Sequence, residues 1–198
     1  LAGIECDIID KLYEVSVRIV CDTGVAVDGP VSGPVSVTID KHTAGTYTQD
    51  FEYKDPQMLD VTPLLGPESG GTEVVITGQA LDTGKLQEIM IGDCYCQYDS
   101  LSDDSVTCTT QSCDAGNKNI VMNFDGVERT YSKQFKFTAD PKVTKVDPIK
   151  SFVSGGRVLT VKGTDLNSVQ KPVMILDGPL RKEVDCEVKG VGRIDCTT

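Results

Sequence analysis

Two stretches of the sequence repeat each other, and this repeat constrains the fold more than any other feature. Residues 51–81 read FEYKDPQMLDVTPLLGPESGGTEVVITGQAL, and residues 135–166 read FKFTADPKVTKVDPIKSFVSGGRVLTVKGTDL. From Asp55 onward the second copy follows the first without a gap, so that Pro63 is matched by Pro148, 85 positions later. A period of this length is too long for a solenoid and suits a small domain used in tandem.

A cysteine motif repeats in a looser frame. Each copy follows an apolar run that ends in glycine, and the copies run from Cys6 to Cys21, from Cys96 to Cys108 and from Cys186 to Cys196. We therefore expect the chain to begin midway through one unit, to contain a second whole unit and to stop midway through a third. The expected boundaries are 1–54, 55–139 and 140–198, called below the first, second and third repeats.

The eight cysteines indicate disulfides and not zinc. Zinc sites usually pair two CxxC knuckles, whereas this chain has no CxxC and a single histidine, His42. An even number of cysteines in an oxidising compartment needs no metal. We expect all eight to be paired, which are Cys6, Cys21, Cys94, Cys96, Cys108, Cys113, Cys186 and Cys196.

The stretch GPESGGTEVVITG, residues 66–78, is close to a phosphate-binding loop. Such a loop needs a lysine after its last glycine and a helix beyond, but Thr72 takes the place of the lysine and a β-branched run follows. In the other copy Ser151 replaces Gly66. The shared element is a Gly-Gly turn before a strand, so we predict no nucleotide site.

Short runs rich in Val, Ile, Phe and Thr predict an all-β fold. In the second repeat we expect strands at 57–61, 73–78, 88–92, 105–110, 119–124 and 133–138, with turns at 103–104, 115–117 and 125–126. In the first repeat we expect strands at 35–39 and 48–53. Short strands at this spacing, without a sustained helical period, predict tandem immunoglobulin-like β-sandwiches. The Asp-Pro junctions leave almost no linker, so consecutive repeats should be held stiffly.

Composition excludes several classes of function. Hydrophobic residues make up 39% and charged residues 25%, as in ordinary globular proteins, and no apolar run approaches the ~20 residues that cross a bilayer. The net charge of −11 opposes binding to a phosphate backbone, so nucleic acid is not an expected partner. The first residues do not read as a signal peptide, which indicates a mature or excised segment. No Asn-x-Ser/Thr acceptor is present.

No group of residues predicts catalysis, a cofactor or a metal site. His42 lies among Asp40, Lys41 and Thr43 and is interpreted as solvated, and Ser-Gly-Gly has no neighbouring base. A cluster of acids lacks the alternating oxygen ligands of a calcium loop and is interpreted as a solvated turn: Asp99, Asp103 and Asp104. Four alternating aromatics are interpreted as packing residues: Phe51, Tyr53, Phe135 and Phe137.

The combination of Asp-Pro, Ser-Gly-Gly, Gly-x-x-Leu and a late cysteine pair resembles the IPT/TIG domain, which has an immunoglobulin-like fold. More narrowly, LAGIEC at 1–6, YEVSVRIVC at 13–21 and SGPVSVTI at 32–39 resemble the end of the first IPT domain of plexins. GPESGGTEVVITGQAL resembles the start of the second, and DPIKSFVSGGRVLTVKGTDLNSVQKP the start of the third.

The resemblance implies a stalk segment of a single-pass cell-surface receptor for semaphorins. Semaphorin would then be bound by a propeller domain outside this chain, the membrane would be crossed outside it, and its immediate partners would be neighbouring ectodomain units. Self-association is left open. The alternative is the IPT stalk of a receptor tyrosine kinase similar to the hepatocyte growth factor receptor, which would contact ligand directly. A third class is an intracellular transcription factor or an accessory domain of a sugar-processing enzyme. The acidic charge and the eight cysteines argue against the transcription factor, and the tandem disulfide-bearing copies argue against the accessory domain.

For the pairing we predict Cys6–Cys21, Cys96–Cys108 and Cys186–Cys196 as the repeated bridge, with Cys94–Cys113 as an additional one. Cys94 and Cys96 lie two apart and point to the same face of a strand, so they do not easily bond each other. Cys94–Cys108 with Cys96–Cys113 stays open as an alternative.

Overall fold

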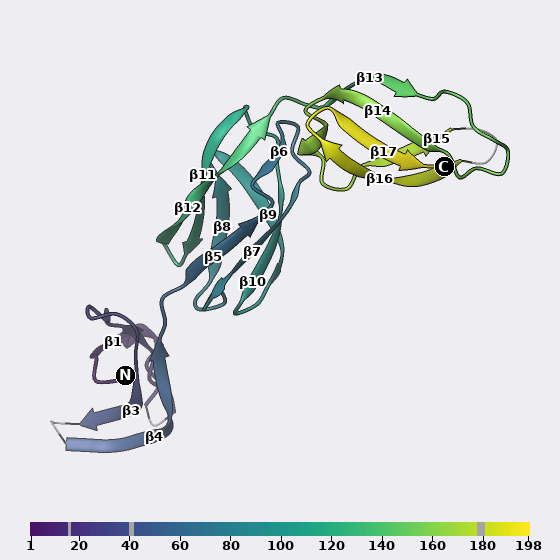
Figure 1. Ribbon diagram of the computed structural model, residues 1–198. Helices are drawn as coiled ribbons and strands as arrows, with labels where there is room; N and C mark the ends of the chain where they lie inside the picture. The colour runs from purple at the N-terminus through teal and green to yellow at the C-terminus, as the bar shows by residue number, and fades with distance from the viewer. Residues whose placement is uncertain (16, 40–41, 178–180) are drawn as a thin grey trace. The chain divides into compact units, whose positions relative to one another are not determined.

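The computed structural model describes residues 1–15, 17–39, 42–177 and 181–198. It consists of strands joined by turns, with two short 3-10 helices and no α-helix in those ranges. No helix in the described part of the chain has the length and apolar character needed to cross a membrane. The all-β immunoglobulin-like class that the sequence predicts is confirmed. The chain divides into two compact units, Leu1–Asp55 and Pro56–Thr198, drawn in Figure 1.

The first unit consists of two hairpin-like pairs. Its elements are β1 Cys6–Ile8, the 3-10 helix η1 Asp10–Leu12, β2 Cys21–Thr23, β3 Val31–Ile39 and β4 His42–Tyr53. β1 pairs with β2, and β3 pairs with β4, both antiparallel. The predicted strands at 35–39 and 48–53 are the C-terminal parts of β3 and β4, and each pairs with the N-terminal part of the other strand. His42, which we expected in a loop, begins β4, and its side chain lies outside the described residues.

The second repeat is a complete sandwich. Its strands are β5 Gln57–Thr62, β6 Leu65–Pro67, β7 Glu73–Gln79, β8 Leu86–Ile91, β9 Cys94–Leu101, β10 Ser105–Thr110, β11 Gly116–Phe124 and β12 Val127–Thr138. They are hydrogen-bonded in the order β5-β7-β10-β9-β8-β11-β12-β6. The Tyr131 hydroxyl on β12 donates to the Asp60 carboxylate on β5 at 3.1 Å, so two distant strands of this order meet in space.

Alternation of apolar side chains builds the core of that sandwich. Val74 and Ile76 on β7, and Ile120, Met122 and Phe124 on β11, point inward while their neighbours are more exposed. On β9 Cys96 alone is fully buried, which is why its polar sequence CYCQYDSL gave no strand prediction. The turn expected at 115–117 is also wrong in part, because β11 already begins at Gly116.

The third repeat contains counterparts of β5, β7, β8, β9 and β10 of the second, and none of β6 among its described residues. They are β13 Lys142–Asp147, β14 Val158–Thr164, the 3-10 helix η2 Leu166–Ser168, β15 Val173–Leu176, β16 Lys182–Gly190 and β17 Arg193–Thr197. Their order is β13-β14-β17-β16-β15. The burial pattern of β14 is the same as that of β7, position by position. Its small core is formed by Val161, Leu166, Val184, Ile194 and Cys196.

Candidate functional site

The Gly-Gly turn of the second repeat uses its backbone donors internally. The amide of Gly70 donates to the Pro67 carbonyl at 3.0 Å, and that of Gly71 to the Thr110 carbonyl at 2.7 Å. A phosphate-binding loop presents its N–H groups to the anion. Here both donors are bonded to carbonyl oxygens and the next element is β7, so this turn does not have the geometry of a phosphate loop.

The same turn is built in the third repeat with the same partners. The amide of Gly155 donates to the Phe152 carbonyl at 3.0 Å, and that of Gly156 donates to the Thr198 carbonyl. Phe152 and Gly155 stand at the positions of Pro67 and Gly70. The repeated sequence therefore forms the same hydrogen bonds twice. In the second repeat they connect the segment before β7 with the end of β10, and in the third they connect the segment before β14 with the end of β17.

The Gly-x-x-Leu motif marks a close approach of two backbones. A Cβ built on Gly78 would lie 2.1 Å from the carbonyl oxygen of Gln57, and one built on Gly163 would lie 2.0 Å from that of Lys142. Leu81 follows as a fully buried core residue, as Leu166 does in the third repeat. Only glycine allows this contact, because any side chain would overlap the neighbouring strand.

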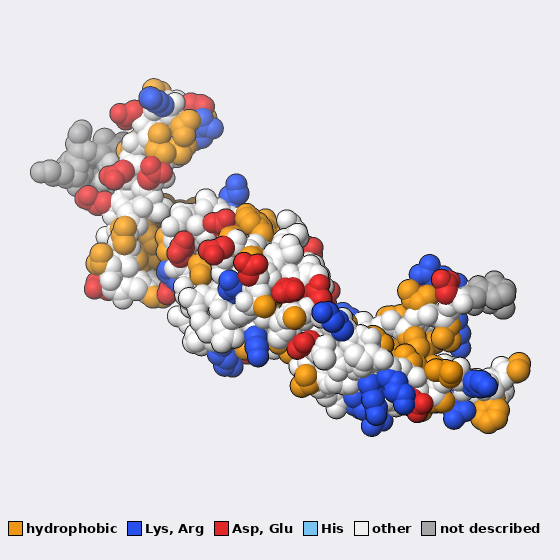
Figure 2. All heavy atoms as spheres, turned by 90° about the horizontal axis from the view of Figure 1, so that it is seen from above, with side chains coloured by type: hydrophobic (Ala, Val, Ile, Leu, Met, Phe, Trp, Pro, Cys, Tyr) orange, Lys and Arg blue, Asp and Glu red, His pale blue; other side chains and the backbone are white. Residues whose placement is uncertain are grey.

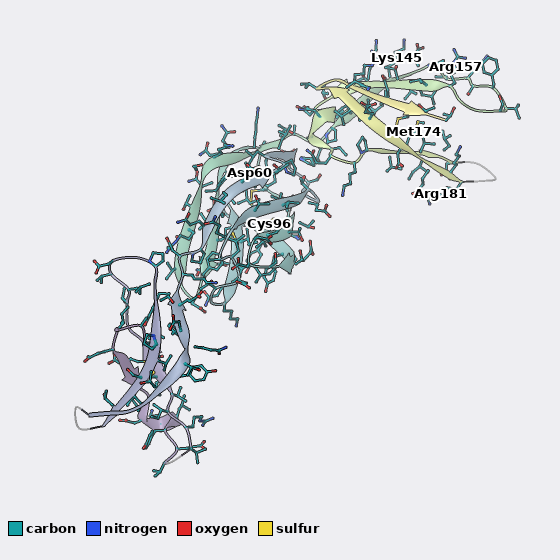
Figure 3. The ribbon with its side chains drawn as sticks, turned by 60° about the horizontal axis from the view of Figure 1, so that its bottom comes forward. Asp60, Cys96, Lys145, Arg157, Met174 and Arg181 are labelled. Carbon is teal, nitrogen blue, oxygen red and sulfur yellow. A yellow bond between two sulfur atoms is a disulfide. The ribbon has the colours of Figure 1, made fainter. Side chains whose placement is uncertain are left out.

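The cysteines form four bridges in the structure. The sulfur atoms are 1.94 Å apart in Cys6–Cys21, 2.02 Å in Cys94–Cys113, 2.09 Å in Cys96–Cys108 and 2.07 Å in Cys186–Cys196. This arrangement is the first of the two that the sequence left open. Cys96, labelled in Figure 3, and Cys108 are fully buried between the layers of the second repeat. The bridge thus belongs to the core and presents no exposed thiol.

Two of the three acidic residues considered as calcium ligands accept hydrogen bonds within the repeat. Thr109 donates to Asp99 at 3.0 Å, and Ser102 donates to Asp104 at 2.8 Å. Within the residues that the structure describes, no three His, Cys, Asp or Glu side chains are arranged to hold a metal ion. The arrangement around these acids is that of a hydrogen-bonded hairpin end.

Phe135 and Phe137, the alternating aromatics of the second repeat, are core residues, as the sequence predicts. The rings of Phe135 and Phe137 have centroids 4.7 Å apart, and both side chains are almost fully buried. In the first unit Phe51 and Tyr53 also contact each other, with centroids 5.1 Å apart and an edge-on geometry. These pairs stabilise their own domains through burial and ring contact.

An apolar cavity of about 440 Å³ lies in the third repeat, lined among others by Val146, Phe152, Leu159 and Met174. In the second repeat the corresponding positions include Val61 and Val74, which are buried in one core with Phe135 and Phe137 of β12. The third repeat has no counterpart of β12 within its described residues. The cavity therefore lies where β12 covers the core in the second repeat, and its lining also includes Lys150, Ser151, Lys182 and Thr198.

The junction after the second repeat is the best-defined candidate site. β12 ends at Thr138 and β13 begins at Lys142. The carboxylate of Asp140 accepts a hydrogen bond from the backbone amide of Ser69 at 2.9 Å. One step earlier, the amide of Glu68 donates to the Thr138 carbonyl at 2.8 Å. The junction is thus bonded to the segment that leads into the Gly-Gly turn, which sequence reasoning did not predict because Ser69 and Asp140 are far apart along the chain.

Two further contacts connect the third repeat with the second inside the unit Pro56–Thr198. The side-chain amide of Gln170 donates to the Leu65 carbonyl at 3.2 Å, and the Lys171 ammonium lies 3.0 Å from a Glu73 carboxylate oxygen. Gln170 and Lys171 follow η2, which lies against β6. No sequence motif signals these residues, because Gln and Lys in a turn are ordinary surface choices.

One exposed ion pair in the third repeat has a distinct electrostatic effect. The Arg193 guanidinium donates two hydrogen bonds to Asp195, at 2.9 and 2.7 Å, and Thr160 donates a third at 3.0 Å. The hydrogen bond from Arg193 is the main cause that holds the pKa of Asp195 below its ordinary value. The same bond raises the pKa of Arg193.

Known proteins with similar sequence and structure share this architecture. The model of the IPT/TIG domain matches residues 56–139. Plexin-B3 of Mus musculus is 37% identical over 177 residues, which are 88% of this chain and 9% of that protein. Plexin-B1 of Homo sapiens is 34% identical over 177 residues, which are 87% of this chain and 8% of that protein. The chain thus spans about a tenth of the length of these curated relatives.

Among solved structures, the full extracellular region of plexin A4 has a TM-score of 0.74 with this chain at 26% identity. The match covers 99% of this chain and 17% of that one. The similarity therefore extends over all three repeats and is confined to one segment of a much longer ectodomain.

Proposed function

Because this chain belongs to the plexins as a run of extracellular IPT/TIG repeats, we propose that it acts as a stiff spacer that sets the geometry of a receptor ectodomain. In this proposal residues 1–54, 55–139 and 140–198 are three consecutive repeats. Ligand capture is assigned to other domains, with semaphorin as the expected ligand, and the repeats themselves contribute no catalysis. Their neighbours in the ectodomain are their direct partners, and their place is the outer side of the cell membrane.

The length of the two junctions supports a stiff spacer. Between the last strand of one repeat and the first strand of the next lie only residues 54–56 and residues 139–141. Both junctions contain Asp-Pro, and proline fixes its own φ while restricting the residue before it. A flexible linker samples many angles because it has many free dihedrals, and these junctions have few.

The observation that carries the proposal is the hydrogen bond from Ser69 to Asp140. It removes conformational freedom from the residue directly before Pro141, at the point where a hinge would otherwise form. A bond to a charged acceptor contributes more than a neutral one. The contacts of Gln170 with Leu65 and of Lys171 with Glu73 act at a second place on the same boundary, and two separated contacts resist rotation better than one.

The experiment measures the distance distribution between the second and third repeats. Spin labels would be placed at Val127 and Val191, which are 51% and 62% exposed. We expect a narrow distribution for the otherwise unchanged chain. The double variant D140A/K171A should broaden it, because it removes the hydrogen bond to Asp140 and the ion pair of Lys171. Asp99→Ala is the matched control, since Asp99 is bonded only within the second repeat. A broad distribution in the unchanged chain would overturn the spacer proposal.

A further inference from the structure

The charge of this chain is divided unevenly between its repeats. The second repeat has 13 Asp and Glu against 5 Lys and Arg, whereas the third has 8 against 10. Figure 2 shows the difference on one face, with acidic side chains over the second repeat and a group of Lys and Arg over the third. An acidic chain thus contains one basic repeat.

Three of these cations form a row across the sheet of the third repeat. Lys145 on β13 stands opposite Lys162 on β14, and Lys162 stands opposite Arg193 on β17. Directly opposed residues in antiparallel strands point to the same face, with Cβ atoms about 4.5–5.5 Å apart. All three side chains are exposed, because the alternate positions Val146, Val161 and Ile194 form the inner face. Lys142, opposite Thr164, adds a fourth cation on this face. We call these four residues the cationic row.

The second repeat shows that the fold does not require this row. At the same three positions it has Asp60, Thr77 and Ser105, which are opposed in the same register. Figure 3 labels Asp60 on β5 and Lys145 on β13. Like charges placed directly opposite each other destabilise a sheet. The third repeat therefore accepts an unfavourable arrangement that its homologous neighbour avoids.

Neighbouring carboxylates cancel only part of this charge. Arg193 is paired with Asp195 at 2.7 Å, which also fixes the plane of the guanidinium, and Lys145 lies 3.7 Å from Asp147. Lys162 has no ion-pair partner among the described residues. Its ammonium lies at the centre of the row, where the potentials of the cations on both sides add.

Protection of a sheet edge does not explain the row. Lysines on an edge strand discourage pairing with another chain, and β13 is at the edge of its sheet. This accounts for Lys142 and Lys145. It does not account for Lys162 and Arg193, because β14 and β17 are inner strands with both neighbours present.

We propose that the cationic row is a binding surface for a sulfated extracellular polysaccharide. The row runs across three paired strands and all four of its side chains are exposed. An exposed row suits a linear polymer with repeated anionic groups better than a small anion that needs an enclosing pocket. Clusters of Lys and Arg bind polyanions of this kind through their summed potential. The surface is separate from the junction contacts, so it stands independently of the spacer proposal.

The test compares binding of the 198-residue chain and its variants to heparin. The variant K145T/K162T removes two cations and introduces threonine, the residue that the second repeat has at position 77. Its control, K150T/K182T, removes the same charge from the same repeat at exposed positions outside the row. We expect the row variant to bind about fivefold more weakly for each cation removed, the effect of one surface cation at an anionic surface. The control should remain within twofold of the unchanged chain.

Three results would overturn the proposal. Equal losses in both double variants would mean that heparin responds only to the total charge. Equal binding to chemically desulfated heparin would remove sulfate as the recognised group. Loss of self-association in K145T/K162T by sedimentation, with unchanged heparin binding, would instead assign the row to the acidic surface of a second copy. As a converse test, T77K/S105R should create heparin binding on the second repeat, and its failure to do so would count against the row as a sufficient site.

Discussion

At the scale of single residues, the two copies of the repeat place the same side chains against the same partners. Gly78 and Gly163 lie against the backbone of the preceding strand. Leu81 and Leu166, three residues later, are buried in the cores of their repeats. These pairs are conserved between copies for steric reasons. Residues on the outer face differ between the copies: Asp60 accepts a hydrogen bond from Tyr131 in the second repeat, whereas Lys145 at the same position of the third is exposed.

The adjacent glycines of the Gly-Gly turn should differ in their tolerance of a side chain. Both have a positive φ, +81° for Gly70 and +80° for Gly71. A Cβ on Gly70 would also lie 2.6 Å from the carbonyl carbon of Gln111, whereas one on Gly71 meets nothing within 4 Å. We expect Gly71→Ala to cost about 1 kcal/mol through backbone strain. Gly70→Ala should cost about 1–3 kcal/mol more through overlap.

Hydrogen exchange of the β7 and β10 amides during urea titration measures this difference locally, which avoids treating several repeats as one transition. Gly45→Ala, in open space in the first unit, serves as a control. Equal losses for the two turn glycines would contradict the steric argument. Neither variant should alter affinity for ATP, and specific ATP binding that Gly71→Ala abolishes would contradict our interpretation of the turn.

The pair Arg193–Asp195 should be visible in the titration of its carboxyl group. The folded-state pKa of Asp195 is lowered, chiefly by the hydrogen bond from Arg193. Its contribution to stability is thus present above the unfolded-state pKa and is lost as the pH falls through the lower folded-state pKa. In Arg193→Ala the pKa of Asp195 should rise towards its ordinary value. Carboxyl-carbon NMR measures this shift, and an unchanged midpoint would mean that Thr160 and Lys189, and not Arg193, hold the charged form.

At the scale of elements, the strands with clear alternation could be predicted and the others could not. β7 and β14 were recognisable because β-branched and aliphatic residues point inward at every second position. β9 was missed because it is held by pairing with β10 and by cysteines, while its exposed half carries polar side chains. β6 was missed because Leu-Gly-Pro has no strand pattern. It pairs only because β12 passes beside it, in parallel.

The candidate site shows the same limit. The Asp-Pro junctions are legible in the sequence, but the partners of Asp140 and Lys171 are set by tertiary proximity, and no local pattern encodes them. The cationic row could not be predicted from the sequence for the same reason. Lys145, Lys162 and Arg193 become neighbours only through strand pairing, although they are separated along the chain.

Of the two bridges in the second repeat, Cys96–Cys108 should contribute more to stability than Cys94–Cys113. Both of its cysteines are fully buried, whereas Cys94 is only partly buried. In the chain-entropy model a short loop of this kind contributes about 3 kcal/mol. C96A/C108A should therefore lower stability by at least this amount, since it also removes buried side-chain volume. C94A/C113A, the matched pair, should lower it less.

Non-reducing peptide mapping of the unchanged chain tests the pairing itself. Recovery of Cys94 joined to Cys108, and of Cys96 joined to Cys113, would overturn the arrangement described here. Free thiols at the repeated positions would overturn the motif as a whole.

At the scale of the whole molecule, the repeats separate two tasks. Bonds at the junctions, such as Ser69 to Asp140, carry the spacer role that we propose. The exposed sheet face of the third repeat carries charge without any junction role. Because the same fold serves in every repeat, a change on an outer face leaves the spacer intact, and a change at a junction leaves the outer faces intact. The two proposals can therefore fail independently.

The spacer proposal makes its sharpest prediction in the full-length receptor. A flexible Gly-Ser segment inserted between Asp140 and Pro141 adds free dihedrals where the chain has almost none. Semaphorin affinity should stay near that of the unmodified receptor, because the proposal assigns ligand binding to other domains. Signalling or autoinhibition should change, since the distance between the ligand-binding and membrane-proximal ends is no longer fixed. The same segment inserted at the hairpin turn Asp125-Gly126, inside the second repeat, is the control and should leave both properties unchanged. If the junction insertion abolishes ligand binding and leaves basal activity unaltered, these repeats form a recognition surface and are not a spacer.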